Sequence, residues 1–333
     1  MKTNMQVQLA STPDSMPVEE NFAVVSGAIP TPNKGQVLVE NQYLSLDPYM
    51  RSQIAGRHIS GSVLPGDVMR GETVSKVIES YHDDFNVGDM VRCFGGWQKY
   101  SVHDADTVFS IDPTIEHPSY VLSALGMPGL TAYAGLIWQA QPKAGDVVVI
   151  PAAIGGVGSV AGQLAKIYGC TVIGIAGSDE KCEYAVNSLG YDACFNRKKE
   201  NIGDMLDKLC PNGIDIYFDL VGGEMLHLVS ERLAVGARVI LCGLMADYNK
   251  TTRSMGPPPA MWIKARAIVY GLVVYDFEPR RDEFVQSCQQ YIRKGQLVVR
   301  EDITPGLSQA PNAFCRLMRG ENMGKVVVDL TAE

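Results

Sequence analysis

The segment 146–162 constrains the fold of this chain more than any other part of the sequence. A β-branched run leads into a turn of small residues that includes Gly155, Gly156 and Gly158, and an apolar helix pattern follows. Small residues are needed where a backbone turns sharply, approaches a pyrophosphate or packs closely against a strand. A helix that begins at such a turn directs N–H groups and the positive end of its dipole toward phosphates. The segment predicts the first strand, turn and helix of a dinucleotide-binding unit.

The second strand, expected at 171–177, indicates which dinucleotide binds. A carboxylate about 20 residues after the glycines typically binds the ribose 2′-hydroxyl of NAD. Here the strand ends in Gly177 and Ser178, and the first acidic residue, Asp179, falls where a helix starts. Lys181 lies in the first turn of that helix. The missing carboxylate, with Ser178 and Lys181 nearby, favours a 2′-phosphate and predicts NADP(H), although Lys181 could also be an ordinary exposed helix lysine.

Composition argues against several classes of protein. The net charge is −8 and no basic run is dense enough for a nucleic-acid interface. No apolar stretch reaches the length of about 18 residues that a membrane span needs, and the first ten residues lack a signal-peptide core. The eight cysteines are scattered without a Cys-x-x-Cys pair, as is typical of reduced thiols. We expect a cytoplasmic protein that acts on a small molecule and binds neither nucleic acid nor membrane.

The pattern of the sequence changes along the chain. Residues 16–125 read as short alternating strands separated by Gly, Pro and Asp, which is typical of an antiparallel, barrel-like domain. From about residue 131, strands alternate with helices, as in a doubly wound parallel sheet. The expected strands are 146–152, 171–177, 192–196, 214–220, 237–243 and 268–274, and helices are expected to begin near 158, 180, 200 and 223, with another at 280–294. After Gly295 we expect strands and loops that rejoin the first domain.

Seven blocks of the chain together carry a family resemblance. They are 44–51, 126–133, 155–162, 176–181, 218–223, 242–249 and 320–325. With these residues the chain resembles the zinc-independent medium-chain dehydrogenase/reductase family, most closely its double-bond reductases: prostaglandin/leukotriene reductases, plant alkenal reductases and bacterial curcumin reductase. The resemblance implies an α/β fold with a β-rich second domain. A GroES-like catalytic domain would comprise 1–130 and 296–333, and an NADP-binding Rossmann domain 131–295 would be inserted in it.

The residues argue against the metal sites of zinc-dependent relatives. Those sites need a Cys–His–Cys or Cys–His–acid set, and often a cluster of four structural cysteines. Cys93 is the only cysteine before Cys170, so the first domain cannot hold such a cluster. Residues 70–72 read Arg-Gly-Glu where zinc-dependent relatives carry Gly-His-Glu, and the segment of the first ligand reads Asp47-Pro-Tyr. The five histidines fall at no ligand spacing and are interpreted as surface or capping residues, so we expect no metal.

Without a metal, conjugate reduction demands less of the protein than carbonyl reduction does. Hydride goes to the β-carbon, and hydrogen-bond donors stabilise the negative charge that develops on the carbonyl oxygen. A tyrosine hydroxyl suits this role because it donates strongly and is neutral at pH 7. The resemblance implies that Tyr248 lies near nicotinamide and substrate, and that Tyr49 and Arg51 line the substrate site. The alternative is that Tyr49 only packs and that Arg51 pairs with a carboxylate.

The resemblance also implies a set of cofactor contacts. They are Thr131, Gly155, Gly156, Val157, Gly177, Ser178, Lys181, Arg197, Cys242, Gly243, Tyr248, Leu272, Val273, Val274 and Asn322. Two positions depart from the family pattern. Leu220 stands where Asn is common, which removes or moves one polar contact. Arg197 stands where Tyr is frequent, and its charge and fork geometry favour a phosphate.

These expectations converge on an NADPH-dependent enzyme that reduces the C=C bond of α,β-unsaturated ketones and aldehydes. Two alternatives stay open: an NADPH quinone oxidoreductase of the same fold, and a protein that binds NADPH without catalysis. The resemblance also implies a homodimer, for which the apolar strand 268–274 could pair edge to edge between subunits.

Overall fold

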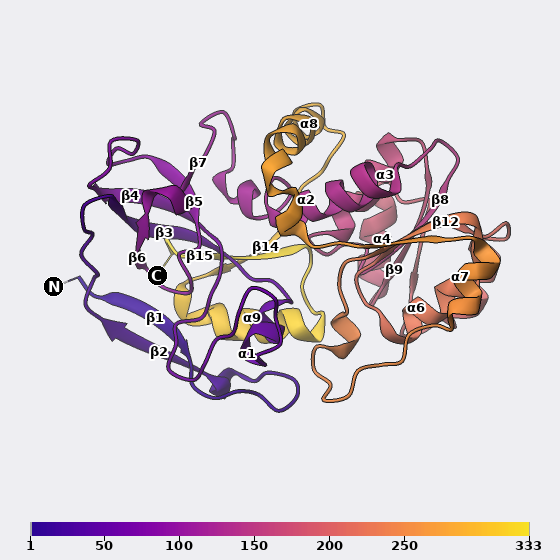
Figure 1. Cartoon of the computed structure of the whole chain (residues 1–333), viewed down its shortest axis with the longest axis horizontal. Coiled ribbons are helices and arrows are strands. Elements are labelled where there is room, and N and C mark those ends of the chain that lie inside the picture. Colours follow the sequence, from indigo (N-terminus) through magenta and orange to yellow (C-terminus); the bar gives the residue numbers. More distant parts are fainter. Residues whose placement is uncertain (1, 333) are drawn as a thin grey trace. The chain divides into compact units, whose positions relative to one another are not determined.

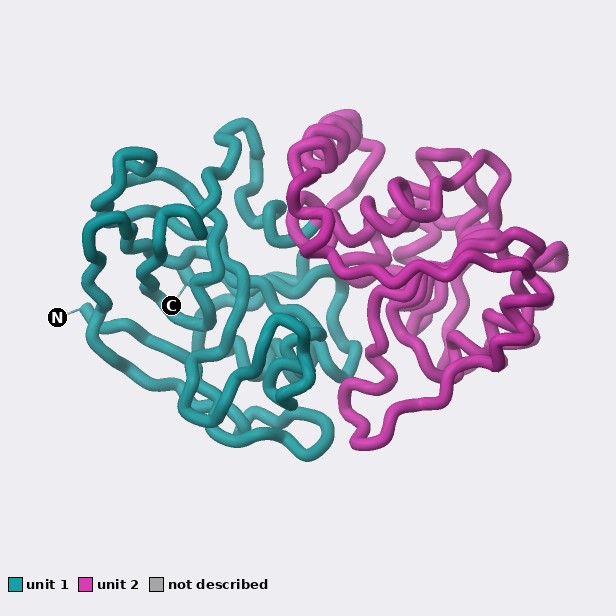
Figure 2. Tube along the Cα trace, in the orientation of Figure 1, with its two compact units in different colours: residues 1–123, 301–333 teal, residues 124–300 magenta. Residues whose placement is uncertain are grey.

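The computed structural model describes residues 2–332 and forms two compact units. Unit 1 comprises Met1–Ser123 and Glu301–Glu333, and unit 2 comprises Ala124–Arg300 (Figure 2). Unit 1 therefore draws on both ends of the sequence, whereas unit 2 is one continuous segment. None of the helices within 2–332 has the length and apolar character needed to cross a membrane.

Unit 2 is built on a six-stranded sheet in which every neighbouring pair is parallel, in the order β10-β9-β8-β11-β12-β13. Figure 1 labels β8, β9 and β12 of this sheet. The strands are β8 (Val147–Pro151), β9 (Thr171–Ala176), β10 (Ala193–Asn196), β11 (Ile214–Asp219), β12 (Leu233–Leu241) and β13 (Ile268–Gly271). The order reverses between β8 and β11, as in a Rossmann fold, and ligands bind such sheets at the carboxyl ends of the strands. The expectation of a doubly wound parallel sheet is confirmed.

Five helices of unit 2 begin close to the expected residues: α3 (Gly158–Ile167), α4 (Asp179–Asn187), α5 (Ile202–Leu209), α6 (Gly223–Ser230) and α8 (Arg281–Arg293). Two others, α2 (Met127–Tyr133) and α7 (Pro259–Ala265), are not among the expected helices. A π-helical segment, η4 (Ala134–Ala140), continues α2, and short 3₁₀ helices lie at η5 (Met245–Asp247) and η6 (Val274–Arg280). Ser178 caps α4 and Asn201 caps α5, since each side chain accepts the backbone N–H three residues later.

Two strand boundaries differ from those expected. β12 begins at Leu233 rather than near 237, and its pairing with β11 shifts register between Ile214 and Ile216. Gly236, with φ of +82°, lies inside this irregular stretch and weakens the strand pattern in the sequence. β13 ends at Gly271, because the chain turns into η6 at Val274.

Unit 1 is built on a mixed, mainly antiparallel sheet in the order β14-β15-β3-β4-β5-β7, with β6 paired to β3. Its strands are β3 (Gln36–Ser45), β4 (Thr73–Ser80), β5 (Met90–Cys93), β6 (Tyr100–Asp104), β7 (Phe109–Ser110), β14 (Glu301–Pro305) and β15 (Lys325–Asp329). A separate ribbon pairs β1 (Asn4–Leu9) with β2 (Phe22–Gly27). The rings of Phe22, Trp97 and Phe314 pack together in the core. Shorter helical segments are η1 (Glu19–Asn21), α1 (Met50–Ile54), η2 (Ala105–Thr107), η3 (Pro118–Leu122) and η7 (Leu307–Gln309).

The expectation of only strands and loops after residue 295 is wrong. The ten-residue helix α9 (Ala310–Arg319) lies there and buries Phe314 and Leu317 in the unit 1 core. Its buried side chains follow the 3.6-residue period, with Pro311 in the first turn and Gly320 as a left-handed C-cap. These helix signals are present in the sequence, but the period is short and lies between two strands.

Candidate active site

The small-residue turn after β8 has the geometry that the sequence predicts. Ala152 takes a left-handed φ of +51°, and its carbonyl accepts the N–H of Gly155 at 2.9 Å. A Cβ on Gly158 would lie 2.4 Å from that same carbonyl oxygen. Only glycine therefore fits where α3 begins, and Gly155, Gly156 and Val157 remain half-buried at the turn.

Tyr191 supports this turn from within the protein, and the sequence analysis did not identify it. Its buried hydroxyl donates to the carbonyls of Ala153 and Gly158, at 3.1 and 2.8 Å. A Cβ on Gly162 would lie 2.2 Å from Cζ of the same ring. Gly162, one of the small residues in the predicted motif, is thus explained by the close packing of Tyr191 against α3.

Cationic side chains lie beside the end of β9, where a carboxylate would bind an unmodified ribose. A Cβ on Gly177 would lie 3.7 Å from Cε of Lys198 and 4.0 Å from Nη2 of Arg197. The parallel pairing of Asn196 with Ala176 explains this proximity, because it brings the residues after β10 next to those after β9. Lys198 was not predicted, because its place beside Gly177 depends on the pairing of β10 with β9.

Asp179 is already engaged by other groups at this edge of the sheet. Its carboxylate accepts the Asn196 side chain at 2.8 Å and pairs with Lys199, and the Lys199 hydrogen bond holds the Asp179 pKa below its usual value. Ser178 caps α4 by accepting the N–H of Lys181 at 3.3 Å, which brings both residues to the start of the helix. Hydroxyl and cationic groups therefore gather where α4 begins, a chemistry suited to a phosphate.

Asp219 joins the loops that follow β11 and β12. Its Oδ1 accepts the Tyr217 hydroxyl at 2.9 Å and the N–H groups of Val221 and Gly222 at 3.0 and 2.8 Å. Its main-chain oxygen accepts the N–H groups of Cys242 and Gly243, two of the predicted cofactor residues, at 3.0 and 3.2 Å. Burial raises the pKa of Asp219. The neighbouring Leu220 is buried.

Tyr248 directly follows η5, in a loop that the side chain of Asp247 cross-links by hydrogen bonds. Asp247 accepts the Ser254 hydroxyl at 2.6 Å, the Ser254 N–H at 3.1 Å and the Lys250 ammonium at 3.2 Å. Burial, followed by the nearby Cys242, raises the pKa of Tyr248. The phenol therefore stays protonated at neutral pH and can donate a hydrogen bond.

The remaining predicted cofactor residues are distributed over both units. In unit 2, the buried Thr131 donates to the Met127 carbonyl at 2.7 Å within α2. Leu272 donates to Leu241 at 3.0 Å just beyond β13, and Val273 and Val274 follow it at the start of η6. In unit 1, Asn322 donates to the Gly324 carbonyl at 2.7 Å and shapes the turn before β15.

In unit 1, Tyr49 and Arg51 belong to the start of α1 and have different surroundings. Tyr49 is half-buried, and its ring packs on the imidazole of His58 with centroids 4.8 Å apart. Arg51 is 1% exposed and its Nη2 donates to the carbonyls of Ser15 and Pro13, at 2.8 and 3.1 Å. These bonds use backbone carbonyls rather than the carboxylate considered above, and they fasten the 13–15 segment to α1.

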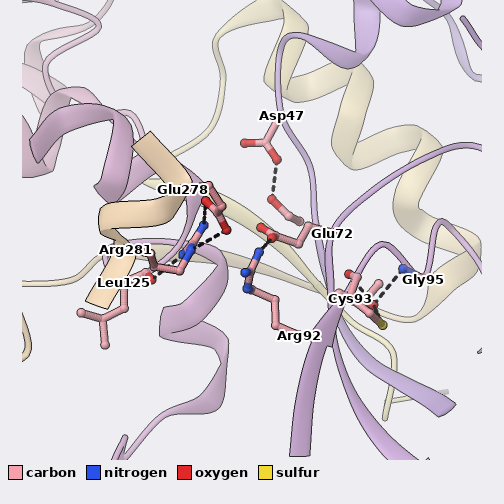
Figure 3. Close-up of polar contacts among 10 residues, drawn as sticks. Asp47, Glu72, Arg92, Cys93, Gly95, Leu125, Glu278 and Arg281 are labelled. Carbon is pink, nitrogen blue, oxygen red and sulfur yellow. Dashed lines mark hydrogen bonds and ion pairs between the residues drawn. The ribbon is translucent and has the colours of Figure 1, made fainter. Parts of the chain in front are cut away.

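The two segments compared above with zinc-binding segments, at Asp47 and at residues 70–72, contain buried ion pairs. Asp47 pairs with Lys325 at 2.8 Å. Glu72 pairs with Arg92, as Figure 3 shows. A Cβ on Gly71 would lie 2.6 Å from Cδ1 of Leu44. Within residues 2–332, no group of three His, Cys, Asp or Glu side chains is placed to hold a metal ion.

Comparison with known proteins identifies the family. A model described as N-terminal domain of oxidoreductase matches residues 5–111, and one described as Zinc-binding dehydrogenase matches 156–290. The chain is 40% identical over 337 residues to the NADPH-dependent curcumin reductase of Escherichia coli (strain K12), covering 99% of this chain and 98% of that protein. The chain belongs to the zinc-independent medium-chain dehydrogenase/reductase family. Within it, the chain falls in the double-bond reductase subfamily.

Two further members of the family share nearly the full length. The 2-alkenal reductase (NADP(+)-dependent) of Nicotiana tabacum is 37% identical, with 99% of this chain and 98% of that protein covered. A crystal structure of CurA from Vibrio vulnificus in complex with NADPH is 42% identical, has a TM-score of 0.93 and covers 98% of both chains. The medium-chain architecture, a GroES-like fold with a Rossmann fold, is therefore the fold of this chain.

Proposed function

We propose that this chain uses NADPH to reduce the C=C bond of α,β-unsaturated ketones and aldehydes. The observation that carries the proposal is the end of β9, where Arg197 and Lys198 flank Gly177 and where the first carboxylate, Asp179, is bound to Asn196 and Lys199. This chemistry suits a 2′-phosphate. Family membership supports the reaction class, because the E. coli and tobacco relatives are named for NADPH- or NADP(+)-dependent reduction.

The residues of unit 2 fit the cofactor along the carboxyl edge of the sheet. Ser178, Lys181, Arg197 and Lys198 would hold the 2′-phosphate, and the turn at 155–157 would face the pyrophosphate. The predicted contacts that would hold the nicotinamide half in unit 2 are Thr131, Cys242, Gly243, Tyr248, Leu272, Val273 and Val274. Asn322 is the predicted contact that belongs to unit 1. When bound, NADPH supplies the hydride that adds to the β-carbon of the substrate.

Tyr248 is the group we assign to the carbonyl oxygen. Its phenol is kept protonated by burial, so it can donate to the oxygen as negative charge develops there. Tyr49 is assigned to the substrate side in unit 1. Arg51 is a positioning residue for Tyr49. Its guanidinium donates to the Pro13 and Ser15 carbonyls, and these bonds fasten the 13–15 segment to α1 beside Tyr49.

We further propose that unit 1 is the catalytic domain and unit 2 the NADP-binding domain of a cytoplasmic homodimer. The eight cysteines are all free thiols, which suits a reducing compartment. β13 ends the sheet order of unit 2, and Ile268 is 53% exposed on it. Such an apolar edge strand is suited to pairing with a second copy.

The experiment is a spectrophotometric comparison of NADPH and NADH oxidation with a linear enone, an enal and a simple quinone. We expect turnover of the enone and enal with NADPH at a kcat/KM well above that with NADH. Turnover of the quinone alone would replace the proposal with quinone reduction. Tight NADPH binding without turnover of any acceptor would leave a non-catalytic protein.

The Lys181→Ala variant tests the cofactor assignment within the same assay. A charged hydrogen bond of about 1.5–3 kcal/mol to the 2′-phosphate corresponds to a roughly 10–150-fold higher KM for NADPH in the variant. The KM for NADH should hardly change, because NADH lacks that phosphate. Equal losses with both cofactors would contradict the assignment.

A further inference from the structure

His58 has an imidazole whose protonation state is set by its neighbours. The N–H of Ser60 donates to Nδ1 of His58 at 3.1 Å, and the Ser60 hydroxyl lies 2.7 Å from the same nitrogen. A backbone N–H can only donate, so Nδ1 must be the acceptor and the ring proton lies on Nε2. The geometry thus fixes a neutral tautomer with an N–H donor at Nε2.

The buried side chain of Gln53 fixes the hydroxyl of Ser60. Its amide donates to the Ser60 hydroxyl at 2.9 Å, which leaves the hydroxyl proton free to point at Nδ1 of His58. The Ser60 carbonyl in turn accepts Nη1 of Arg70 at 3.0 Å. Ser60 is therefore bonded through its hydroxyl, its N–H and its carbonyl. These bonds fix the orientation of the His58 imidazole.

The second ring nitrogen of His58 is a donor that the described part of the protein does not use. Within residues 2–332, its Nε2 has no hydrogen-bond partner, and the ring is only partly covered. The ring packs on Tyr49 with a centroid distance of 4.8 Å and an interplanar angle of 30°. The imidazole that carries the Nε2 donor thus packs on the tyrosine ring that we assign to the substrate side.

We propose that His58 is a second substrate-contacting residue, whose Nε2–H donates to an oxygen of the substrate other than the conjugated carbonyl. The proposal rests on the assignment of enone reduction and deepens it, because it predicts a preference for substrates that carry a further oxygen. A hydroxyl or second carbonyl near the alkene would accept this hydrogen bond. An unsubstituted alkyl chain would leave Nε2–H unpaired against an apolar group, which is unfavourable.

Two linear enals that differ only in one γ-hydroxyl test the preference in the full-length enzyme. We expect the hydroxylated enal to have the higher kcat/KM, and His58→Phe, which keeps a ring on Tyr49, to reduce that preference about 3–10-fold. On the plain enal, kcat/KM should rise in this variant, because the unpaired Nε2–H is removed. His58→Gln retains an N–H donor and should keep most of the preference.

His117→Phe is the matched control, because His117 also packs on a tyrosine, Tyr120, with centroids 4.9 Å apart in the same unit. Equal loss on both enals, an unchanged ratio in His58→Phe, or equal losses in His58→Phe and His58→Gln would each overturn the role of His58. If the wild-type enzyme oxidises NADPH with neither enal, the proposed function itself fails. Thermal melting of each variant separates a folding defect from a change in the ratio.

Discussion

At the scale of single residues, two acids on neighbouring loops have pKa values shifted in opposite directions. Asp219 is surrounded by donors that fix the turn after β11, and burial raises its pKa. Asp247 closes the loop that carries Tyr248, and its bonds to Ser254 and Lys250 keep its pKa below the usual value despite burial. The position of the Tyr248 phenol therefore depends on carboxylates that need not touch substrate.

Replacement of Tyr248 by Phe should lower kcat for an enone by about 10–1,000-fold, because one donor to the developing oxyanion is removed. The raised pKa means that the donating, protonated form persists above the ordinary phenol value of 10.0. The wild-type kcat should consequently show no fall attributable to this tyrosine between pH 7 and 9. Stopped-flow NADPH oxidation across that range measures both effects.

Tyr81→Phe serves as the control for that prediction, since Tyr81 is exposed and its hydroxyl donates to Glu79. If Tyr248→Phe keeps the wild-type rate of a chemical step shown to be rate-limiting, Tyr248 has no catalytic role.

At the scale of elements, helix α3 and strand β9 are separated by little more than one aromatic ring. Tyr191 fills that space, and its hydroxyl ties together the carbonyls of Ala153 and Gly158. The turn that faces the pyrophosphate in our proposal is therefore held from beneath by a side chain outside the glycine motif.

Gly162→Ala should destabilise the protein by about 1–3 kcal/mol, because the new methyl would lie 2.2 Å from the Tyr191 ring. This cost exceeds the gain of about 1 kcal/mol that alanine normally brings to a helix interior. Urea unfolding measures the loss, and NADPH affinity should weaken with it as the ring is displaced. Gly256→Ala is the control, with nothing within 4 Å of its Cβ; equal stability of the two variants would refute the packing argument.

The elements of unit 2 were largely predictable because each strand is a β-branched run bounded by glycine or a helix cap. α9 was missed because its apolar period spans only ten residues. Lys198 and Tyr191 were missed for another reason. The role of Lys198 depends on which strands are neighbours, and the role of Tyr191 depends on how closely a helix approaches a strand. The residue pattern of a single sequence predicts neither of these. His58 was interpreted as a surface or capping residue, since its tautomer depends on the fold of the 58–60 turn.

At the scale of the whole molecule, a buried ion pair fastens the last strand to the first part of the sequence. Lys325 on β15 bonds to Asp47 at 2.8 Å and also to the Leu46 carbonyl, and both charged side chains are nearly inaccessible. β15 pairs with the end of β3. The sheet of unit 1 is thus completed only when the returning tail is in place.

Lys325→Met should cost about 3–5 kcal/mol in unfolding free energy, since it leaves the Asp47 carboxylate buried without its cation. The double variant Asp47→Leu/Lys325→Met should recover most of that loss, because the uncompensated charge is gone. Urea unfolding at pH 7 measures both. The exposed pair Arg280–Glu283 provides the control, and Glu283→Gln should leave the midpoint unchanged. A Lys325→Met midpoint equal to the wild type would disprove the argument.

The separation of that ion pair along the chain also sets an order of events during synthesis. Asp47 precedes Lys325 by 278 residues, which corresponds to roughly 15–55 s of translation at ~5–20 residues per second. Unit 2 can close as soon as Arg300 has emerged, whereas the β3 segment Tyr43–Ser45 must wait for β15. During that interval the nascent chain exposes an unpaired strand edge beside an unneutralised carboxylate. A chain released before Lys325 is added would therefore be aggregation-prone although its nucleotide-binding half is already folded.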